Sequence, residues 1–261
     1  MGEAPTSGMV VIGDEILSGR TRDANMHHLA GRLTEAGAPL SEVRVVADEH
    51  DLIVEAVQAL SARHAYVFTS GGIGPTHDDI TADAVAAAFG AAIDVREDAR
   101  AILLARYGDE SLLTEARLRM ARIPQGASLI ENPVSGAPGF RLGNVFVMAG
   151  VPSVFEAMVQ SALPQIDGGP PVLSHALRLP VPEGDLAGPL KAVAETHAQV
   201  SFGSYPFYAP PTVEGGRGAF GATVVARSAD RAALSEAAAS LRVMAAELGV
   251  ADMAEETPPA G

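Results

Sequence analysis

The chain has 261 residues, of which 48% are hydrophobic and 19% are charged, values typical of one large globular domain or of a medium and a small one. Asp and Glu number 32 against 18 Lys and Arg, and the formal net charge of −14 disfavours non-specific binding to nucleic acid or to anionic membranes. The absence of cysteine excludes disulfides, thiol nucleophiles and cysteine-ligated zinc. No apolar run approaches the ~20 residues of a membrane helix, and no signal-peptide pattern is present. We therefore expect a cytoplasmic protein.

Short apolar runs alternate with amphipathic segments over the first ninety residues. The pattern predicts strands at 9–12, 43–46 and 66–69, and helices at 24–36, 52–62 and 82–89. Asp23 is expected to cap the first helix, and Gly37 and Gly90 to end the first and third helices. A βαβ alternation of this kind is typical of a parallel sheet with helices on its faces.

A helical excursion is predicted at 97–122, divided in two by Gly108. The segment 145–148 then returns to the sheet, and Ser153 and Glu156 have the spacing of a capping box that begins a helix reaching about Leu163. Residues 1–166 are thus predicted to form a three-layer αβα domain with a mostly parallel sheet.

A proline- and glycine-rich linker at 167–171 is the predicted domain boundary. Beyond it, residues 172–250 are expected to form a small α+β domain, and 251–261 a disordered tail. A KH nucleic-acid clamp needs a Gly-x-x-Gly loop between helices, whereas Gly215-Gly216-Arg217-Gly218 falls between two predicted strands. No nucleic-acid partner is therefore expected.

The segment Thr69–Thr81, with the sequence TSGGIGPTHDDIT, follows one predicted strand and precedes a helix. A glycine-rich turn in this context favours phosphate binding, because the backbone approaches the anion and the N–H groups stabilise its charge. It is neither a Walker loop nor a dinucleotide fingerprint, since no Gly-Lys-Ser/Thr follows and His77 replaces the third glycine. Asp78 and Asp79 would repel a phosphate unless a divalent cation lay between them.

Four loops are expected to meet at one edge of the sheet, because ligands bind beyond the carboxyl ends of parallel strands. These loops contain Gly13-Asp14-Glu15, Ala47-Asp48-Glu49, Gly71-Gly72 and Ala149-Gly150-Val151-Pro152. Asp48 and Asp79 are the strongest candidates for chemistry. Each has an alternative role as the cap of the helix that follows it. His77 could act as a general acid, but a peripheral phosphate contact or a solvated loop position is favoured.

The glycine-rich segment closely resembles the signature loop of the MoaB/Mog-type molybdopterin-binding domain. The form is that of the CinA (competence/damage-inducible protein A) family and of the related domain in eukaryotic FAD synthases. The resemblance continues through 13–19, Asn25, Asp48, Asn132-Pro133, 137–140 and 150–153, and covers roughly residues 8–165. The segment Met148–Pro152 departs from the family pattern, and the small C-terminal module resembles the KH-like middle domain of CinA proteins.

The resemblance implies a metal-dependent nucleotide pyrophosphatase, a hydrolase acting on ADP-ribose or FAD-like diphosphates. Asp48 and Asp79 would then be both catalytic residues and ligands of a divalent metal, Mg²⁺ or, in vitro, a Co²⁺-like ion. The predicted phosphate- and ligand-binding residues are Gly13, Asp14, Ser18, Gly19, Asn25, Ser70, Gly71, Gly72, Gly74, Thr76, Asp78, Thr81, Ser135, Gly136, Gly139 and Gly150.

Two alternatives remain open: a molybdopterin- or nucleotide-binding protein without turnover, and a molybdopterin adenylyltransferase-like enzyme of molybdenum cofactor biosynthesis. The resemblance also implies a homo-oligomer with a small-molecule nucleotide or pterin ligand and no membrane partner. Complete CinA proteins carry a C-terminal nicotinamide-nucleotide amidase unit, and the given sequence ends before one, so no amidase activity is expected.

Overall fold

The computed structural model describes residues 5–209, 219–250 and 254–256. The chain divides between Gly169 and Pro170 into two compact units, a position inside the predicted linker 167–171. Each unit has a sheet and a hydrophobic core of its own.

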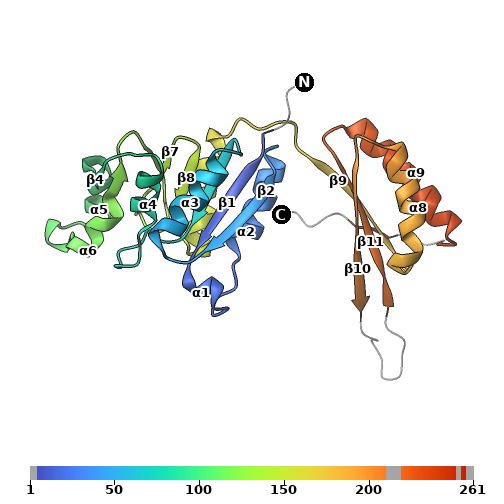
Figure 1. The fold of residues 1–261 in the computed structure, drawn as a ribbon, viewed down its shortest axis with the longest axis horizontal. Coiled ribbons are helices and arrows are strands. Elements are labelled where there is room, and N and C mark those ends of the chain that lie inside the picture. Colours follow the sequence, from blue (N-terminus) through green and yellow to red (C-terminus); the bar gives the residue numbers. More distant parts are fainter. Residues whose placement is uncertain (1–4, 210–218, 251–253, 257–261) are drawn as a thin grey trace. The chain divides into compact units, whose positions relative to one another are not determined.

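The first unit is built on a six-stranded sheet in the order β2-β1-β3-β8-β7-β6 (Figure 1). Its four parallel strands are β1 (Ser7–Ile12), β2 (Leu40–Val46), β3 (Tyr66–Ser70) and β8 (Val145–Met148). The short strands β7 (Gly139–Leu142) and β6 (Ser128–Ile130) complete one end through antiparallel pairs. The carboxyl ends of the four parallel strands therefore lie at the same edge.

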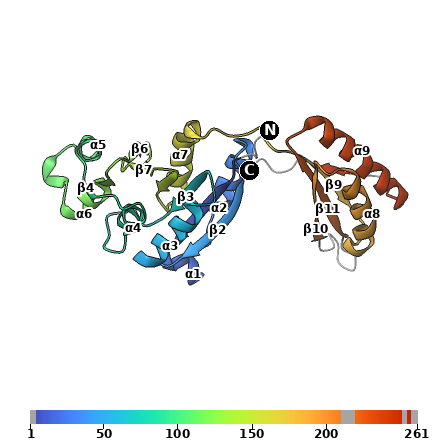
Figure 2. The same ribbon diagram turned by 45° about the horizontal axis from the view of Figure 1, so that its top comes forward.

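Helices cover both faces of this sheet, as Figures 1 and 2 show. On one face, α2 (Asn25–Glu35) and α7 (Pro152–Ala162) pack with a core that contains Phe68, Phe146 and Phe155. On the other face, the core contains residues of α3 (His50–Ser61), α4 (Thr81–Ala88) and α5 (Glu97–Tyr107). Alternate residues of β1 enter the two cores, so the strand is buried throughout. The predicted three-layer αβα architecture is confirmed.

The predicted excursion at 97–122 is helical and is broken after Tyr107, where Gly108 takes a left-handed conformation. It continues through η1 (Glu110–Leu112), α6 (Glu115–Leu118) and η2 (Arg119–Ala121). A two-stranded ribbon of β4 (Ile93–Val95) and β5 (Arg122–Pro124) closes its base. The helical segment therefore lies between two short strands, β4 and β5, that pair with each other at its base.

Several local predictions for this unit need correction. The strands β4 to β7 were not predicted, because each has only three or four residues and too little periodicity to detect. The capping box at Ser153 and Glu156 is wrong, since Pro152 takes the first helical position and Val151 is the N-cap with no side-chain hydrogen bond. Asp23 precedes the N-cap residue Ala24, but its carboxylate still accepts a hydrogen bond from the Met26 N–H at 3.0 Å.

The second unit is the small α+β domain expected from the sequence. Its antiparallel sheet has the order β10-β11-β9-β12, formed by β9 (Leu173–Leu179), β10 (Ser201–Ala209), β11 (Ala219–Ser228) and β12 (Ala254–Glu256). Its helices are α8 (Glu183–Thr196) and α9 (Arg231–Glu247), which contribute to a core with Leu177, Leu179 and Val224.

The predicted disordered tail is wrong for residues 254–256, because this segment pairs with β9 as a fourth strand. The remainder of that tail and the glycine-rich segment 215–218 lie outside the described residues. Among the described helices, none combines the length and apolar character that crossing a membrane requires.

Candidate active site

A cleft of about 570 Å³ lies at the carboxyl edge of the parallel strands. This volume is in the range of small-molecule binding sites. The loops that follow β1, β2, β3 and β8 all contribute to its lining, as the sequence predicted. The lining residues are Ile12, Gly13, Glu15, Thr21, Asp48, Gly71, Gly72, Ile73, Gly74, Pro75, Asp78, Asp79, Met120, Asn132, Ser135, Ala137, Ala149, Gly150, Val151, Pro152 and Val154.

The glycine turn after β3 has a conformation that excludes side chains. Gly71 has φ +107°, and a Cβ at this position would overlap the carbonyl oxygen of Ile12 on the neighbouring strand. The buried Thr81 hydroxyl donates to the Gly71 carbonyl at 2.9 Å, and the Thr81 N–H donates to the Gly72 carbonyl at 3.0 Å. The beginning of α4 therefore holds the turn in place.

Three consecutive backbone donors in this turn are unpaired. Within the described residues, the N–H groups of Gly72, Ile73 and Gly74 donate no hydrogen bond, although all three residues line the cleft. Unpaired N–H groups next to a helix N-terminus suit an oxyanion, because the helix dipole adds to their attraction. The turn has the chemistry of a phosphate cradle.

Asp48 follows β2 and is half-buried. Its Oδ2 accepts a hydrogen bond from the Asp14 N–H at 2.9 Å, which joins the loops after β1 and β2. Burial raises the pKa of Asp48, and the charges of Asp14, Glu15 and Asp78 raise it further, against the lowering effect of the Asp14 hydrogen bond. The alternative role as a helix cap is wrong, since α3 begins after Glu49 without a side-chain cap.

Asp79 stabilises the loop before α4. Its Oδ2 accepts hydrogen bonds from the Thr76 N–H at 2.7 Å and from the Thr76 hydroxyl at 2.5 Å. Here too the capping alternative is wrong, because Ile80 is the N-cap of α4 and provides no side-chain bond. One Asp79 oxygen is thus committed to the loop, while the residue lines the cleft.

The carboxylates of the cleft fit a hard divalent cation through their chemistry. Glu15, Asp48, Asp78 and Asp79 line it, and none of the described lining residues is basic. In the described part of the chain no three His, Asp or Glu side chains form a ready-made metal cage. Mg²⁺ needs no such cage, because it keeps several waters and binds one or two carboxylates together with substrate phosphates.

Asn25 supports the site from behind. This buried residue donates through Nδ2 to the Ser70 hydroxyl and to the Gly150 carbonyl, both at 2.7 Å. It therefore ties α2 to the ends of β3 and β8. The predicted ligand role of Asn25 and Ser70 is not what this geometry favours, since both side chains are buried and neither lines the cleft.

Asn132 organises the loop at the other side of the cleft. Its Oδ1 accepts from the N–H groups of Val134 and Ser135, and its Nδ2 donates to the Ser135 hydroxyl and to the Ala137 carbonyl. Asn132, at the centre of this network, is buried, with 7% of its surface exposed. It places Ser135 and Ala137 in the wall of the cleft.

The structure brings together about half of the residues predicted to bind ligand. Those that line the cleft are Gly13, Asp48, Gly71, Gly72, Gly74, Asp78, Asp79, Ser135 and Gly150. Those that do not line it are Asp14, Ser18, Gly19, Asn25, Ser70, Thr76, Thr81, Gly136 and Gly139. Several residues that do not line the cleft hold residues that do. Asp14 is hydrogen-bonded to Asp48, Thr76 to Asp79, and Thr81 to the Gly71 carbonyl. His77 is a fully exposed loop residue, as its favoured interpretation expected.

Glu15, Thr21, Met120 and Asn132 line the cleft but were not among the predicted site residues. Glu15 and Asn132 stand inside motifs that the sequence had identified, so their neighbours were a usable signal. Met120 belongs to η2 and reaches the site only because the excursion folds back on β5. No sequence pattern indicated that return.

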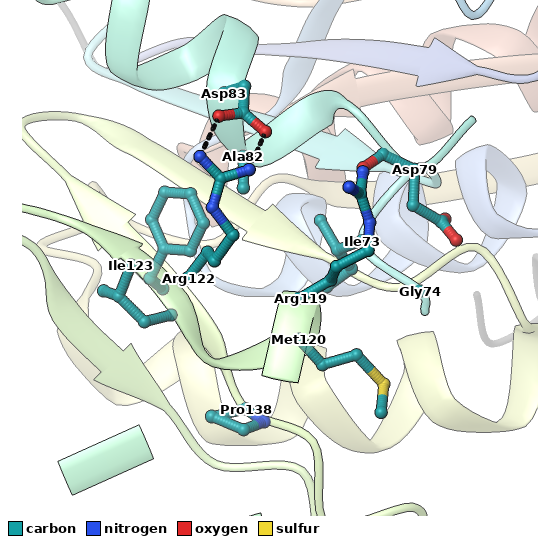
Figure 3. A pocket seen from close by; sticks show the side chains of 11 residues that line it. Ile73, Gly74, Asp79, Ala82, Asp83, Arg119, Met120, Arg122, Ile123 and Pro138 are labelled. Carbon is teal, nitrogen blue, oxygen red and sulfur yellow. Dashed lines mark hydrogen bonds and ion pairs between the residues drawn. The ribbon is translucent and has the colours of Figure 1, made fainter. Parts of the chain in front are cut away.

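A small hollow adjoins the cleft and shares Ile73, Gly74, Asp79 and Met120 with it. Figure 3 shows two arginines there, one at each end of η2. Arg122 forms a double hydrogen bond with the Asp83 carboxylate, at 2.7 and 2.6 Å. Arg119 lies at the backbone of Asp79 and donates to its carbonyl oxygen at 3.0 Å.

Comparisons with known proteins agree with this arrangement. Residues 8–168 match the family described as "probable molybdopterin binding domain", and residues 171–253 match "FAD synthase, middle domain". A protein of Aeropyrum pernix is 36% identical over 216 residues, 79% of this chain and 81% of its own. A protein of Pyrobaculum calidifontis is 34% identical over 212 residues, 77% of this chain and 81% of its own.

Among solved structures, CinA from Thermoplasma acidophilum, described as a protein with unknown function, is similar to this chain. It is 36% identical with a TM-score of 0.59, over 62% of this chain and 98% of its own. The family match over residues 8–168 covers nearly all of the first unit, including all four loops of the cleft. The chain therefore belongs to the molybdopterin-binding domain family, in a form related to CinA that is joined to a FAD synthase-type middle domain.

Proposed function

We propose that this protein is a metal-dependent hydrolase of nucleotide diphosphates, with ADP-ribose or FAD-like compounds as substrates. The observation that carries the proposal is the combination of donors in one cleft: three unpaired N–H groups on the glycine turn beside four carboxylates. An anion cradle in so acidic a cleft suits a substrate that arrives with a cation.

In this proposal the chain's own groups bind and orient the diphosphate. The N–H groups of Gly72, Ile73 and Gly74 donate to phosphate oxygens, and the turn costs no reorganisation because Thr81 already holds it. Asp48 and Asp79 would hold a divalent cation such as Mg²⁺, or Co²⁺ in vitro, which supplies charge neutralisation on the phosphates and activation of water.

The reaction is a hydrolysis at phosphorus. The oxygen of a water forms a bond to one phosphorus, the bridging P–O bond breaks, and the bridging oxygen leaves on the other phosphate. With ADP-ribose the products are AMP and ribose 5-phosphate, and the protons of the water pass to solvent.

The match of the second unit to the FAD synthase middle domain supports a nucleotide-processing role. A second candidate, binding of molybdopterin without turnover, is favoured by the family to which the first unit belongs. A pterin phosphate would use the same glycine turn. An adenylyltransferase of molybdenum cofactor biosynthesis would use it for a nucleotide as well.

Side-by-side assays distinguish these functions. The purified chain is incubated with ADP-ribose, FAD or molybdopterin plus ATP, each with Mg²⁺, with Co²⁺ and with EDTA, and products are separated by ion-exchange chromatography. The proposal expects AMP from ADP-ribose or FAD only in the metal-containing samples. Binding of molybdopterin with no cleavage of any diphosphate would reject hydrolysis and support the second candidate, whereas adenylylated molybdopterin would support the transferase.

A further inference from the structure

The negative charge of the cleft lining opposes the binding of a negatively charged diphosphate. Its described lining residues include four carboxylates and no basic side chain. A bound diphosphate adds further negative charge, and a single divalent cation does not offset all of it. A second positive group close to the phosphates would stabilise the complex.

Arg119 is a positive group beside the cleft. It lines the hollow that shares Gly74 and Asp79 with the cleft, so its guanidinium stands beside the phosphate cradle (Figure 3). Figure 3 also shows that it lies at the backbone carbonyl of Asp79, while the Asp79 carboxylate points away from it.

The guanidinium is held but not neutralised. One terminal nitrogen donates to the Asp79 carbonyl at 3.0 Å, which fixes its direction. The buried Nε has no hydrogen-bond partner, and in the described part of the chain no carboxylate forms an ion pair with Arg119. The other terminal nitrogen, Nη1, donates no hydrogen bond in the described part of the chain and is not enclosed, so it is the donor that a ligand oxygen can reach.

Arg122, in the same segment, has a structural role and differs from Arg119 in its hydrogen bonds. Both of its terminal nitrogens are bonded to Asp83, and the pair joins β5 to α4. Three residues away, Arg119 makes only one bond and keeps the rest of its planar fork for another partner. The excursion 97–122 thus uses one arginine to join β5 to α4 and places the other in the hollow beside the cleft.

We propose that Arg119 binds a phosphate oxygen of the substrate, next to the Gly72–Gly74 cradle. This inference rests on the proposed binding of a diphosphate in the cleft, and it adds a substrate-contacting residue supplied by η2. The Nη1 group, which has no partner among the described residues, can donate a charge-assisted hydrogen bond to a phosphate oxygen while the bond to the Asp79 carbonyl holds the guanidinium in place.

The test measures binding of a diphosphate that cannot be cleaved. The probe is ADP with a methylene bridge between its two phosphates, titrated with Mg²⁺ into the full chain by calorimetry at several salt concentrations. Arg119→Gln should weaken binding roughly 10- to 100-fold, the loss expected for a charge-assisted hydrogen bond. Its affinity should also depend less on salt, because one exposed charge interaction is gone. Arg119→Lys should restore part of the affinity.

Arg117→Gln is the matched control. It removes the same charge two residues away, from a guanidinium that stacks on Tyr107 and donates to the Leu112 carbonyl. Unlike Arg119, Arg117 lines neither the cleft nor the adjoining hollow. Its affinity should equal that of the unmodified chain. A melting curve of each variant checks that the fold is intact.

Each outcome decides the inference. Unchanged affinity in Arg119→Gln overturns it, and so does a loss with unchanged salt dependence and no recovery in Arg119→Lys, which would show that Arg119 only supports the loop. A chain that binds the probe through Arg119 but cleaves no diphosphate upholds this inference while rejecting hydrolysis. A chain that binds no probe at any Mg²⁺ concentration overturns both proposals.

Discussion

Asp48 and Asp79 lie at the same cleft, but the fold holds them differently. Asp48 is tied through the Asp14 N–H to the loop after β1. Asp79 is tied through two bonds to Thr76, within its own loop. Neither caps the helix that follows it. In each residue Oδ2 holds a loop, and no hydrogen bond to Oδ1 is formed within the described part of the chain, so that oxygen is left for a ligand.

Asp79→Asn should reduce metal-dependent diphosphate hydrolysis by on the order of 10²-fold or more, because the charge that holds the cation is removed. Asp48→Asn should behave similarly, and the double variant should be little worse than either single one, as for groups that act as a unit. Initial rates at saturating Mg²⁺ give the comparison. Stability should barely change in Asp79→Asn, since the amide oxygen can still accept from Thr76. Full activity in Asp79→Asn would reject its catalytic role.

Asn25 is a stabilising residue by the same reasoning. Asn25→Ala removes two buried hydrogen bonds and leaves the Gly150 carbonyl without its donor, so we expect a loss of about 2–4 kcal/mol in the free energy of unfolding. Urea denaturation measures it. His77→Ala, at a fully exposed loop position, should leave stability unchanged. A loss below about 0.5 kcal/mol for Asn25→Ala would show that Asn25 does not tie the loops together.

The turn between β3 and α4 is the element on which the site depends. It must pass close to the Ile12 carbonyl of β1 while leaving its own N–H groups unpaired. A strand–turn–helix unit can do this only when glycine takes conformations that other residues avoid. The glycines of this turn are therefore needed both for its backbone conformation and for the unpaired N–H groups that bind the ligand in the proposed function.

Gly71→Ala should destabilise the protein by about 2–4 kcal/mol and abolish diphosphate binding, because the added Cβ meets backbone that cannot move aside. Gly90→Ala is a control for the effect of a positive φ alone. Its φ is +64° and nothing lies within 4 Å of an added Cβ, so about 1 kcal/mol should be lost with binding intact. Thermal melts and calorimetric titrations of both variants test this. Equal effects at the two positions would contradict the close approach at Gly71.

At the scale of the whole molecule, the chain consists of two units with separate sheets and separate cores. All of the described residues that line the cleft belong to the first unit. The second unit is thus not needed to build the site. The predicted homo-oligomer stays a prediction, which a light-scattering mass above the 26.8 kDa of one chain would support.

Asp230→Ala tests whether the units are energetically separate. Asp230 caps α9 by accepting from the Ala232 and Ala233 N–H groups at 2.8 and 3.2 Å, and its loss should cost about 1 kcal/mol. Amide hydrogen exchange should then accelerate about fivefold in peptides of α9 and β9 and remain unchanged in β1 and β3. Acceleration throughout both units would show that they unfold together.

Much of the first unit could be predicted from the sequence because its signals are local. Glycines, strand-forming runs and helix periodicity fixed β1, β2, β3, α2, α3 and α4 to within a few residues. The rule that parallel strands end at one edge then brought the loops of Gly13, Asp48, Gly71 and Gly150 together correctly. Predictions failed where the signal was short, as at β4 to β7, or where two local rules competed, as at Ser153 and Pro152.

Only the tertiary structure decided which candidate residues line the cleft and which support the lining residues. The sequence determined that Asn25, Ser70 and Thr81 belong to the region of the site, but hydrogen bonds over 10 to 125 residues of separation made them supports and not lining residues. Met120 reaches the cleft, and Arg119 the hollow beside it, through a return of the chain that no sequence pattern indicated. A sequence pattern describes neighbours along one helix or strand. Burial and side-chain direction depend instead on which distant elements pack together. For this reason the position of Arg119 beside the glycine turn could be found only from the folded structure.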